Sequence, residues 1–319
     1  MKKLICVLLV LTLALPALAL AEGSLIKVGV VCPDPAASSY WETSMRDMET
    51  TFTAKNGYDA EFVRADIQAL ALDLINGGAQ YLLICPVGTQ EWEPVLETAK
   101  RRGVTVFLYD RTAGIDPELY TAAVVNDYAA QGELAVSWLE NLGLEKYDIL
   151  YLAETPGTTE HDERSFALAA KCSLDDSWNI VAASSGMQGR EEVFRLVDGT
   201  VRMEIGFNVV YTESDRLAEW AVEAMDEYGI PHGTADGAAI VVSFECDRQA
   251  MLELLDGGRN FEVQSSPFQA SLIDLMIKTL EGGGSLDFLD EQKRLVSLPT
   301  GFDALYVTEG DVETYGLGE

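Results

Sequence analysis

Short apolar runs alternate with longer amphipathic stretches along most of this chain. Residues 26–32 form an apolar run that ends at Pro33, a pattern typical of a strand buried on both faces. Residues 41–55 place apolar side chains at helical spacing and stop at Asn56-Gly57, a common signal for the end of a helix. The pattern therefore predicts a strand followed by a helix.

The same pairing recurs towards the end of the chain, with connections short enough for parallel strands. Further strands are predicted at 60–63, 81–85, 104–109, 122–125, 149–152, 180–183, 209–211 and 239–243. Further helices are predicted at 69–75, 91–102, 129–142, 163–170, 191–202, 217–228, 248–255 and 267–280. We therefore predict an α/β protein with two doubly wound parallel-sheet, Rossmann-like lobes. In such sheets a ligand binds outside the carboxyl ends of the strands.

The first residues have the three parts of an export signal. Lys2 and Lys3 are basic, residues 4–15 are apolar, and Ala19-Leu20-Ala21 is a small-x-small cleavage site. The apolar part is too short for a comfortable membrane span. No cysteine stands at the cleavage site, so lipid attachment is not expected. We predict removal of residues 1–21 and a periplasmic or secreted product.

The charge of the chain narrows the choice of partners. The formal net charge is -30, which disfavours binding to nucleic acid or to anionic lipid. The acidic residues are dispersed rather than gathered in one block, so the simplest interpretation is a solvated surface. Electrostatic steering of a cationic ligand is the alternative.

The cysteines and histidines give no metal pattern. Cys32, Cys85, Cys172 and Cys246 follow the leader, and none forms a C-x-x-C motif or a zinc-ligand spacing. Cys32 and Cys85 each end a predicted strand. We expect buried free thiols there, with a disulfide as the alternative. No metal or other cofactor is expected.

Catalytic motifs are missing from the sequence. It has no Gly-x-Ser-x-Gly elbow, no His-Glu-x-x-His motif and no phosphate-binding glycine loop. An enzyme is therefore disfavoured, although paired carboxylates of a secreted glycosidase could occur among 52 acidic residues.

One long segment carries a family likeness. Residues 82–111, LLICPVGTQEWEPVLETAKRRGVTVFLYDR, combine a strand ending in Pro86, a helix start at 92–96, a turn at 99–104 and a strand ending in Asp110. This segment resembles the type I periplasmic sugar-binding proteins of ABC importers, and it is most similar to their ribose and galactofuranose-binding branch. The likeness continues in order through 125–132, 185–191, 210–215, 242–245 and 263–264.

The resemblance implies two lobes joined by a three-stranded hinge that closes on a ligand. The chain would cross the hinge near Val125, near Gln264 and shortly after Lys293. The implied parts are a leader at 1–21, an N-terminal lobe at 22–125 and 264–293, and a C-terminal lobe at 126–263 and 294–319.

The resemblance also implies ligand contacts from the N-terminal lobe. Asp110 and Arg111 match a pair that binds ring and hydroxyl oxygens, with an ordinary ion pair as the alternative. Tyr40 and Trp41 follow the first strand, where the family places aromatic rings that stack on the sugar. Their alternative role is packing at a helix start.

The contacts implied for the C-terminal lobe depart more from the family pattern. Arg164 is the nearest match to a family arginine, and only with a gap in the loop at 157–166. Ser214 stands where the family usually has Asn, although Asp215 is kept. Glu245 takes the place of a hinge aspartate, with a solvated turn as the alternative. Gln264 matches the hinge amide, with a hinge hydrogen bond as the alternative. Two further departures are Gln188, which replaces an aromatic residue, and Glu42, which stands where the galactofuranose branch has Arg.

From this resemblance we expect a monomeric extracytoplasmic solute-binding protein. It would hold a neutral sugar-like ligand, mainly through its N-terminal lobe, and deliver it to an ABC permease. An anionic ligand is not expected, because Asp110, Asp215 and Glu245 would all face it. The alternatives are a sensor component that presents its ligand to a membrane receptor and, less favoured, a secreted carbohydrate-active enzyme.

Overall fold

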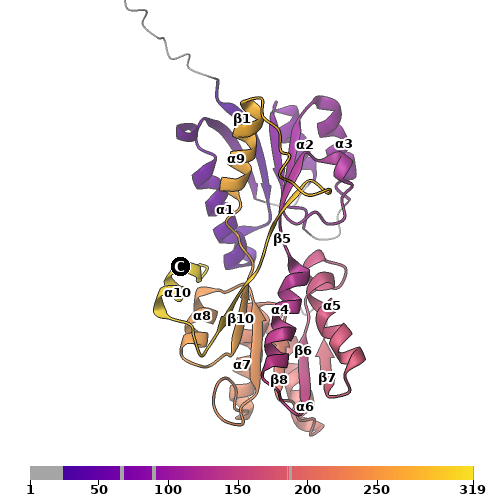
Figure 1. Cartoon of the computed structure of the whole chain (residues 1–319), viewed down its shortest axis with the longest axis vertical. Coiled ribbons are helices and arrows are strands. Elements are labelled where there is room, and N and C mark those ends of the chain that lie inside the picture. The colour runs from indigo at the N-terminus through magenta and orange to yellow at the C-terminus, as the bar shows by residue number, and fades with distance from the viewer. Residues whose placement is uncertain (1–23, 65–67, 88–90, 185, 187–188, 319) are drawn as a thin grey trace, which may run out of the picture.

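Two α/β lobes stacked end to end make up the computed structural model (Figure 1). It describes residues 24–64, 68–87, 91–184, 186 and 189–318. The predicted leader and Gln188 lie outside these ranges. Each lobe contains one six-stranded sheet, so the predicted fold class is confirmed. No helix in the described part of the chain is long and apolar enough to cross a membrane.

The first sheet is entirely parallel, with the strand order β11-β5-β4-β3-β1-β2. Its strands are β1 (Ile26–Cys32), β2 (Tyr58–Arg64), β3 (Tyr81–Ile84), β4 (Thr105–Asp110), β5 (Ala122–Asn126) and β11 (Arg294–Ser297). The central strands are buried on both faces, which explains their continuous apolar sequence.

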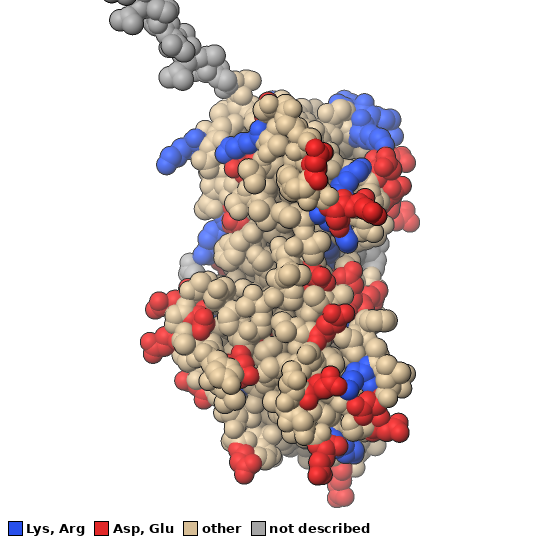
Figure 2. Space-filling view, viewed as in Figure 1, with Lys and Arg blue, Asp and Glu red and all other residues tan. Residues whose placement is uncertain are grey.

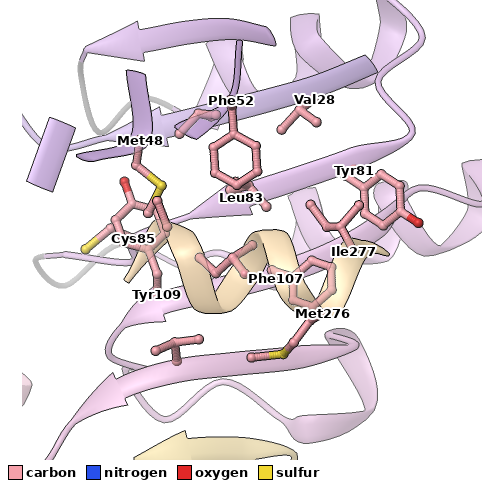
Figure 3. Packing of buried hydrophobic residues seen from close by; sticks show 14 of the residues in the cluster. Val28, Met48, Phe52, Tyr81, Leu83, Cys85, Phe107, Tyr109, Met276 and Ile277 are labelled. Carbon is pink, nitrogen blue, oxygen red and sulfur yellow. The ribbon is translucent and has the colours of Figure 1, made fainter. Parts of the chain in front are cut away.

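Helices cover both faces of this sheet. They are α1 (Ser39–Thr51) and α9 (Ala270–Glu281) on one face, and α2 (Gln68–Asn76) and α3 (Glu93–Arg102) on the other. Short 3-10 turns lie at Pro35–Ala37, Ala54–Asn56 and Pro117–Leu119. Figure 3 shows Phe52, Leu83, Phe107 and Ile277 meeting in the core under α9. Because α9 comes from the end of the chain, this core requires two distant segments.

The second sheet has the order β12-β10-β9-β8-β6-β7, and only β12 is antiparallel to its neighbour. Its strands are β6 (Tyr147–Leu152), β7 (Trp178–Ser184), β8 (Val209–Thr212), β9 (Ile240–Phe244), β10 (Phe261–Gln264) and β12 (Thr300–Asp303). Its helices are α4 (Tyr128–Asn141), α5 (Thr159–Leu174), α6 (Arg190–Arg202), α7 (Asp215–Tyr228), α8 (Arg248–Leu255) and α10 (Glu309–Tyr315).

The chain passes from one sheet to the other three times. It leaves the first sheet after β5, returns after β10, and leaves again after β11. We expected the last passage shortly after Lys293, but Arg294–Ser297 pairs with β5 and belongs to the first sheet. The passage therefore follows Ser297, where Pro299 interrupts the extended chain.

The cysteines that follow the leader are free thiols. Cys32 and Cys85 are buried at the ends of β1 and β3, as expected. The Tyr109 hydroxyl donates to the Val31 carbonyl at 2.9 Å and lies 3.0 Å from the Cys32 sulfur. Burial raises the pKa of Cys32 to about 12, so its thiol stays protonated and packs as an apolar group.

Candidate functional site

Two adjoining cavities lie between the lobes, at the carboxyl ends of the strands. The inner cavity has a volume of about 50 Å³ and is lined by Tyr40, Trp41, Arg111, Tyr128, Glu160, Arg164, Glu245 and Ser265. The outer cavity has a volume of about 400 Å³ and is lined by Ala37, Ser38, Trp41, Glu154, Thr155, Glu160, Arg164, Ser214, Arg216, Leu217, Trp220, Glu245 and Asp247. Small-molecule sites usually measure about 300–1,000 Å³, so only the outer cavity has the size of a ligand site.

A further cavity of about 510 Å³ lies elsewhere in the second lobe. Its lining includes Asn208, Ile240 and Asn260, which stand at the amino ends of β8, β9 and β10. Ligands in open parallel sheets bind at the opposite ends of the strands. We therefore place the candidate site between the lobes.

Asp110 is the centre of a buried hydrogen-bond network under the inner cavity. It accepts from the Tyr40 hydroxyl, from Asn126 Nδ2 at 2.9 Å and from the Tyr128 hydroxyl at 2.8 Å. Arg111 Nε donates at 2.7 Å to Asp110 Oδ2, the oxygen that also accepts the 2.8 Å bond from Tyr128, while Tyr40 and Asn126 donate to Oδ1. Only 1% of Asp110 is exposed, and it lines neither cavity. Asp110 therefore orients Arg111 and the two tyrosines.

Arg111 connects the two lobes. It follows β4 in the first lobe and forms an ion pair with Glu160, which lies in the first turn of α5 in the second. Its Nη2 donates to the Tyr128 hydroxyl at 3.1 Å, and its guanidinium lies 5.5 Å from the Trp41 ring centroid. Burial alone would raise the pKa of Glu160, but Arg111 outweighs burial and lowers that pKa to about 2. Glu160 is therefore ionised near neutral pH.

Arg164 on α5 forms the floor that both cavities share. Its nitrogens donate to Gln131 Oε1 at 2.8 Å, to the Glu213 carbonyl at 2.8 Å and to Ser265 Oγ at 3.2 Å. Its guanidinium lies 5.0 Å from the Tyr128 ring centroid. Gly132 on α4 allows this placement, because a Cβ there would lie 2.2 Å from the Arg164 carbonyl oxygen.

Glu245 lines both cavities and follows β9 on a turn of unusual geometry. Its φ is 111° and that of Cys246 is 65°, both in the region that favours glycine. Its backbone N–H donates to the Val263 carbonyl at 3.0 Å, while its carboxyl group has no hydrogen-bond partner among the described residues. Burial, reinforced by the charge of Asp247, raises the pKa of Glu245 well above its ordinary value.

Three more polar groups surround the outer cavity. Ser214 Oγ donates to Glu154 Oε1 at 2.7 Å, and burial raises the pKa of Glu154. Asp247 accepts from Ser39 Oγ, a second contact between the lobes. Burial, and then the neighbouring Asp215, raise the pKa of Asp247 to about 7.

The nine residues predicted from the sequence divide into two groups. Six line the cavities: Tyr40, Trp41, Arg111, Arg164, Ser214 and Glu245. Asp110, Asp215 and Gln264 do not. Asp215 is buried in an ion pair with Arg259 at 2.9 Å and accepts from Ser243 at 2.9 Å. Gln264 donates to the Tyr315 carbonyl at 2.7 Å. Each of these three residues thus has at least one polar atom bonded to a neighbouring protein group.

The site predicted from the sequence did not include eleven of the lining residues, among them Tyr128, Glu154, Glu160, Trp220 and Ser265. The sequence positions of two of them, Glu160 and Tyr128, could have predicted that they line the site. Glu160 lies four residues before Arg164, so on a helix the two share a face. Tyr128 follows Asp127, the N-cap after β5, and so lies at a strand's carboxyl end. Within the described residues, no group of three or more His, Cys, Asp or Glu side chains could hold a metal ion.

The two sheets, the three passages between them and the cavities at the carboxyl ends of the strands define the class of two-lobed, hinged binding proteins. The family model named "Periplasmic binding protein domain" matches residues 28–283. The chain therefore belongs to the periplasmic binding protein family. Members of this family are solute-binding proteins.

Curated relatives are similar over much of the chain. The galactofuranose-binding protein YtfQ of Escherichia coli K12 is 26% identical over 228 residues, which cover 70% of this chain and 71% of the relative. The ribose import binding protein RbsB of Bacillus subtilis 168 is 22% identical over 195 residues, which cover 61% of this chain and 60% of the relative.

Solved structures share the fold. A Mycobacterium smegmatis protein in complex with β-D-fucofuranose aligns with a TM-score of 0.77 and 20% identity, covering 91% of this chain and 93% of that one. The binding component of the arabinose ABC transporter from Shewanella sp. ANA-3, bound to L-arabinofuranose, aligns with a TM-score of 0.77 and 21% identity, covering 90% and 93%. The myo-inositol binding protein of Caulobacter aligns with a TM-score of 0.74 and 16% identity, covering 92% and 96%.

Proposed function

We propose that this protein is the exported solute-binding component of an ABC importer, and that it captures a sugar-like polyol between its lobes without chemically changing it. The observation that carries the proposal is the outer cavity of about 400 Å³, which both lobes line at the carboxyl ends of their strands. Trp41 and Trp220 provide flat apolar faces for the C–H surface of a ring, and carboxyl, hydroxyl and guanidinium groups provide partners for hydroxyls.

The names of the relatives support a small polyhydroxylated ligand. Those proteins are described with galactofuranose, ribose, arabinofuranose and myo-inositol. The same cavity disfavours a carboxylate or phosphate ligand, because Glu154, Glu160, Glu245 and Asp247 all line it. We propose a ligand without negative charge, a monomeric protein and a membrane permease as its partner.

A thermal-shift screen of residues 22–319 tests this function. The panel contains pentoses, hexoses and cyclitols, with phosphosugars and dicarboxylates as matched anionic compounds. A ligand at 100-fold excess over its Kd adds about 2.7 kcal/mol to the free energy of unfolding. We expect polyols to raise the melting temperature and anions to leave it unchanged. Selective stabilisation by a phosphosugar or a dicarboxylate would contradict the proposal.

A further inference from the structure

The hydrogen-bonding groups left for a ligand in this site are unevenly divided between donors and acceptors. All three nitrogens of Arg111 and all three of Arg164 already donate to protein atoms. Glu160 holds one of the Arg111 nitrogens, and it reaches that position from the opposite lobe. These contacts fix the position of both buried cations, although each Nη carries a second N–H group beyond the one counted here.

The acceptors of the outer cavity are largely unused. The Glu245 carboxyl group has no hydrogen-bond partner among the residues that the structure describes. Glu154 accepts from Ser214 through one oxygen only, and Asp247 accepts from Ser39 through one oxygen only. A carboxylate can only accept hydrogen bonds. Among the residues that the structure describes, Arg216 is the one lining cation outside the buried pair, and it is exposed at the first turn of α7.

Aromatic rings accompany these carboxyl groups. Trp41 and Trp220 line the same outer cavity as Glu154 and Glu245. Rings together with carboxylates are the surroundings in which an ammonium group binds well, because a cation is attracted to the face of an indole. Figure 2 shows acidic side chains spread over the second lobe on the face in view, while most of the basic ones on that face lie on the first lobe. The charge of the second lobe favours the approach of a cation.

We propose that the ligand is a sugar or cyclitol that carries an ammonium group, with its ring against Trp41 and Trp220 and its ammonium against Glu245 and Glu154. This inference rests on the proposed function and replaces the neutral ligand expected from the sequence with a cationic one. It needs no displacement of Glu160 from Arg111, because the outer cavity already has the volume of a ligand site.

The titration behaviour of Glu245 agrees with this arrangement. Burial and the nearby Asp247, Asp215 and Glu154 raise the pKa of Glu245, and Arg164 only partly opposes them. The raised pKa favours the neutral acid form of Glu245. An ammonium group beside it favours the carboxylate, so the proton of Glu245 passes to the buffer when the ligand binds.

Calorimetry with matched pairs tests the inference on residues 22–319. The pairs are D-glucosamine and D-glucose, D-galactosamine and D-galactose, and scyllo-inosamine and scyllo-inositol. N-acetylglucosamine serves as an enlarged neutral control. We expect at least one amine to bind about tenfold to a hundredfold more tightly than its neutral partner, since hydrogen bonds to charged groups contribute about 1.5–3 kcal/mol. Repeating the titration in buffers of different ionisation enthalpy should reveal proton release.

Two variants test whether Glu245 is responsible for the preference for the amine. Glu245→Gln should lower the affinity for the amine far more than the affinity for its neutral partner, and so abolish the preference for the amine. Glu227→Gln makes the same charge change at an exposed position near the end of α7 and should keep the preference. If neutral polyols bind as tightly as their amines, the inference is overturned while the proposed function stands. If no member of the panel binds, both are overturned. An amine preference that survives in Glu245→Gln contradicts the assignment to Glu245.

Discussion

Glu160 is a single side chain that joins the two lobes by charge. Its partner Arg111 is 4% exposed, and Glu160 itself is 23% exposed, so solvent screens the pair only weakly. Burying two charges is favourable only when each has a partner and further hydrogen bonds. Asp110 and Tyr128 supply those bonds to Arg111. The pair therefore stabilises contact between the lobes only while Glu160 is ionised.

We predict that Glu160→Gln lowers the free energy of unfolding at pH 6 by about 3 kcal/mol. This follows from a pKa lowered from 4.5 to about 2, at about 1.4 kcal/mol per pKa unit. The lowered pKa means that the contribution is complete above pH 4.5 and is lost as the pH falls towards 2. Urea unfolding of both proteins should therefore show their difference shrinking by about 1 kcal/mol by pH 3.5. A difference that does not change with pH would contradict the ion pair.

Glu245 should act on stability with the opposite sign. Its raised pKa means that it favours folding at low pH and opposes folding as the pH rises through the raised value. We predict that the wild-type protein loses more stability between pH 5 and pH 8 than Glu245→Gln does, because glutamine keeps the neutral form. Urea unfolding at the two pH values, without ligand, measures this. Parallel losses in the two proteins would show that Glu245 does not titrate in this range.

Among the elements, the packing of α4 against α5 positions the cavity floor. Gly132 permits the two helices to approach so closely that any Cβ there would collide with backbone. The backbone that a Cβ at Gly132 would contact is that of Arg164. A substitution on α4 therefore displaces α5 and, with it, the Arg164 side chain in the site.

We predict that Gly132→Ala destabilises the protein by about 1–3 kcal/mol, the usual result of overpacking. Because α5 must shift, Arg164 should move and ligand affinity should fall as well. Gly199→Ala is the matched control, since Gly199 lies within helix α6 and a Cβ there meets no atom within 4 Å. That change should stabilise the protein by about 0.5–1 kcal/mol. Chemical denaturation measures the free energy of unfolding of both variants. An unchanged free energy of unfolding in Gly132→Ala would contradict the argument.

The elements also show what the sequence could and could not predict. Apolar runs located the strands, and strand ends located the region of the site, because both depend on local pattern. Whether a polar side chain at a strand end faces the cavity depends on its neighbours. Asp110 and Asp215 both stand at such ends, yet Tyr128 and Arg259 respectively engage them. Glu160 faces the cavity because the lobes meet there, and no local pattern contains that information.

For the whole molecule, the three passages between the sheets predict a hinge. Their short extended segments can bend while each sheet stays rigid. We predict that a saturating ligand, identified by the screen above, lowers the radius of gyration measured by small-angle scattering. The Glu160→Gln protein without ligand should have a larger radius than the wild type, because it lacks one contact between the lobes. Identical profiles in all three samples would argue against hinge closure.

The leader also predicts an outcome for the whole chain. Cleavage after Ala21 should give an extracytoplasmic protein whose sequence begins at Glu22. N-terminal sequencing of the protein recovered outside the cytoplasm measures this directly. An uncleaved product that remains in the membrane would contradict the prediction.

The position of β11 has a consequence for how the chain is made. Strand β11 completes the edge of the first sheet, and α9 completes its core, yet both come from residues 270–297. The ribosome therefore has to release the chain as far as residue 297 before the first lobe can finish folding. Pairings so distant along the chain form slowly. This order of assembly is compatible with the predicted export, in which the chain would cross the membrane unfolded and fold afterwards.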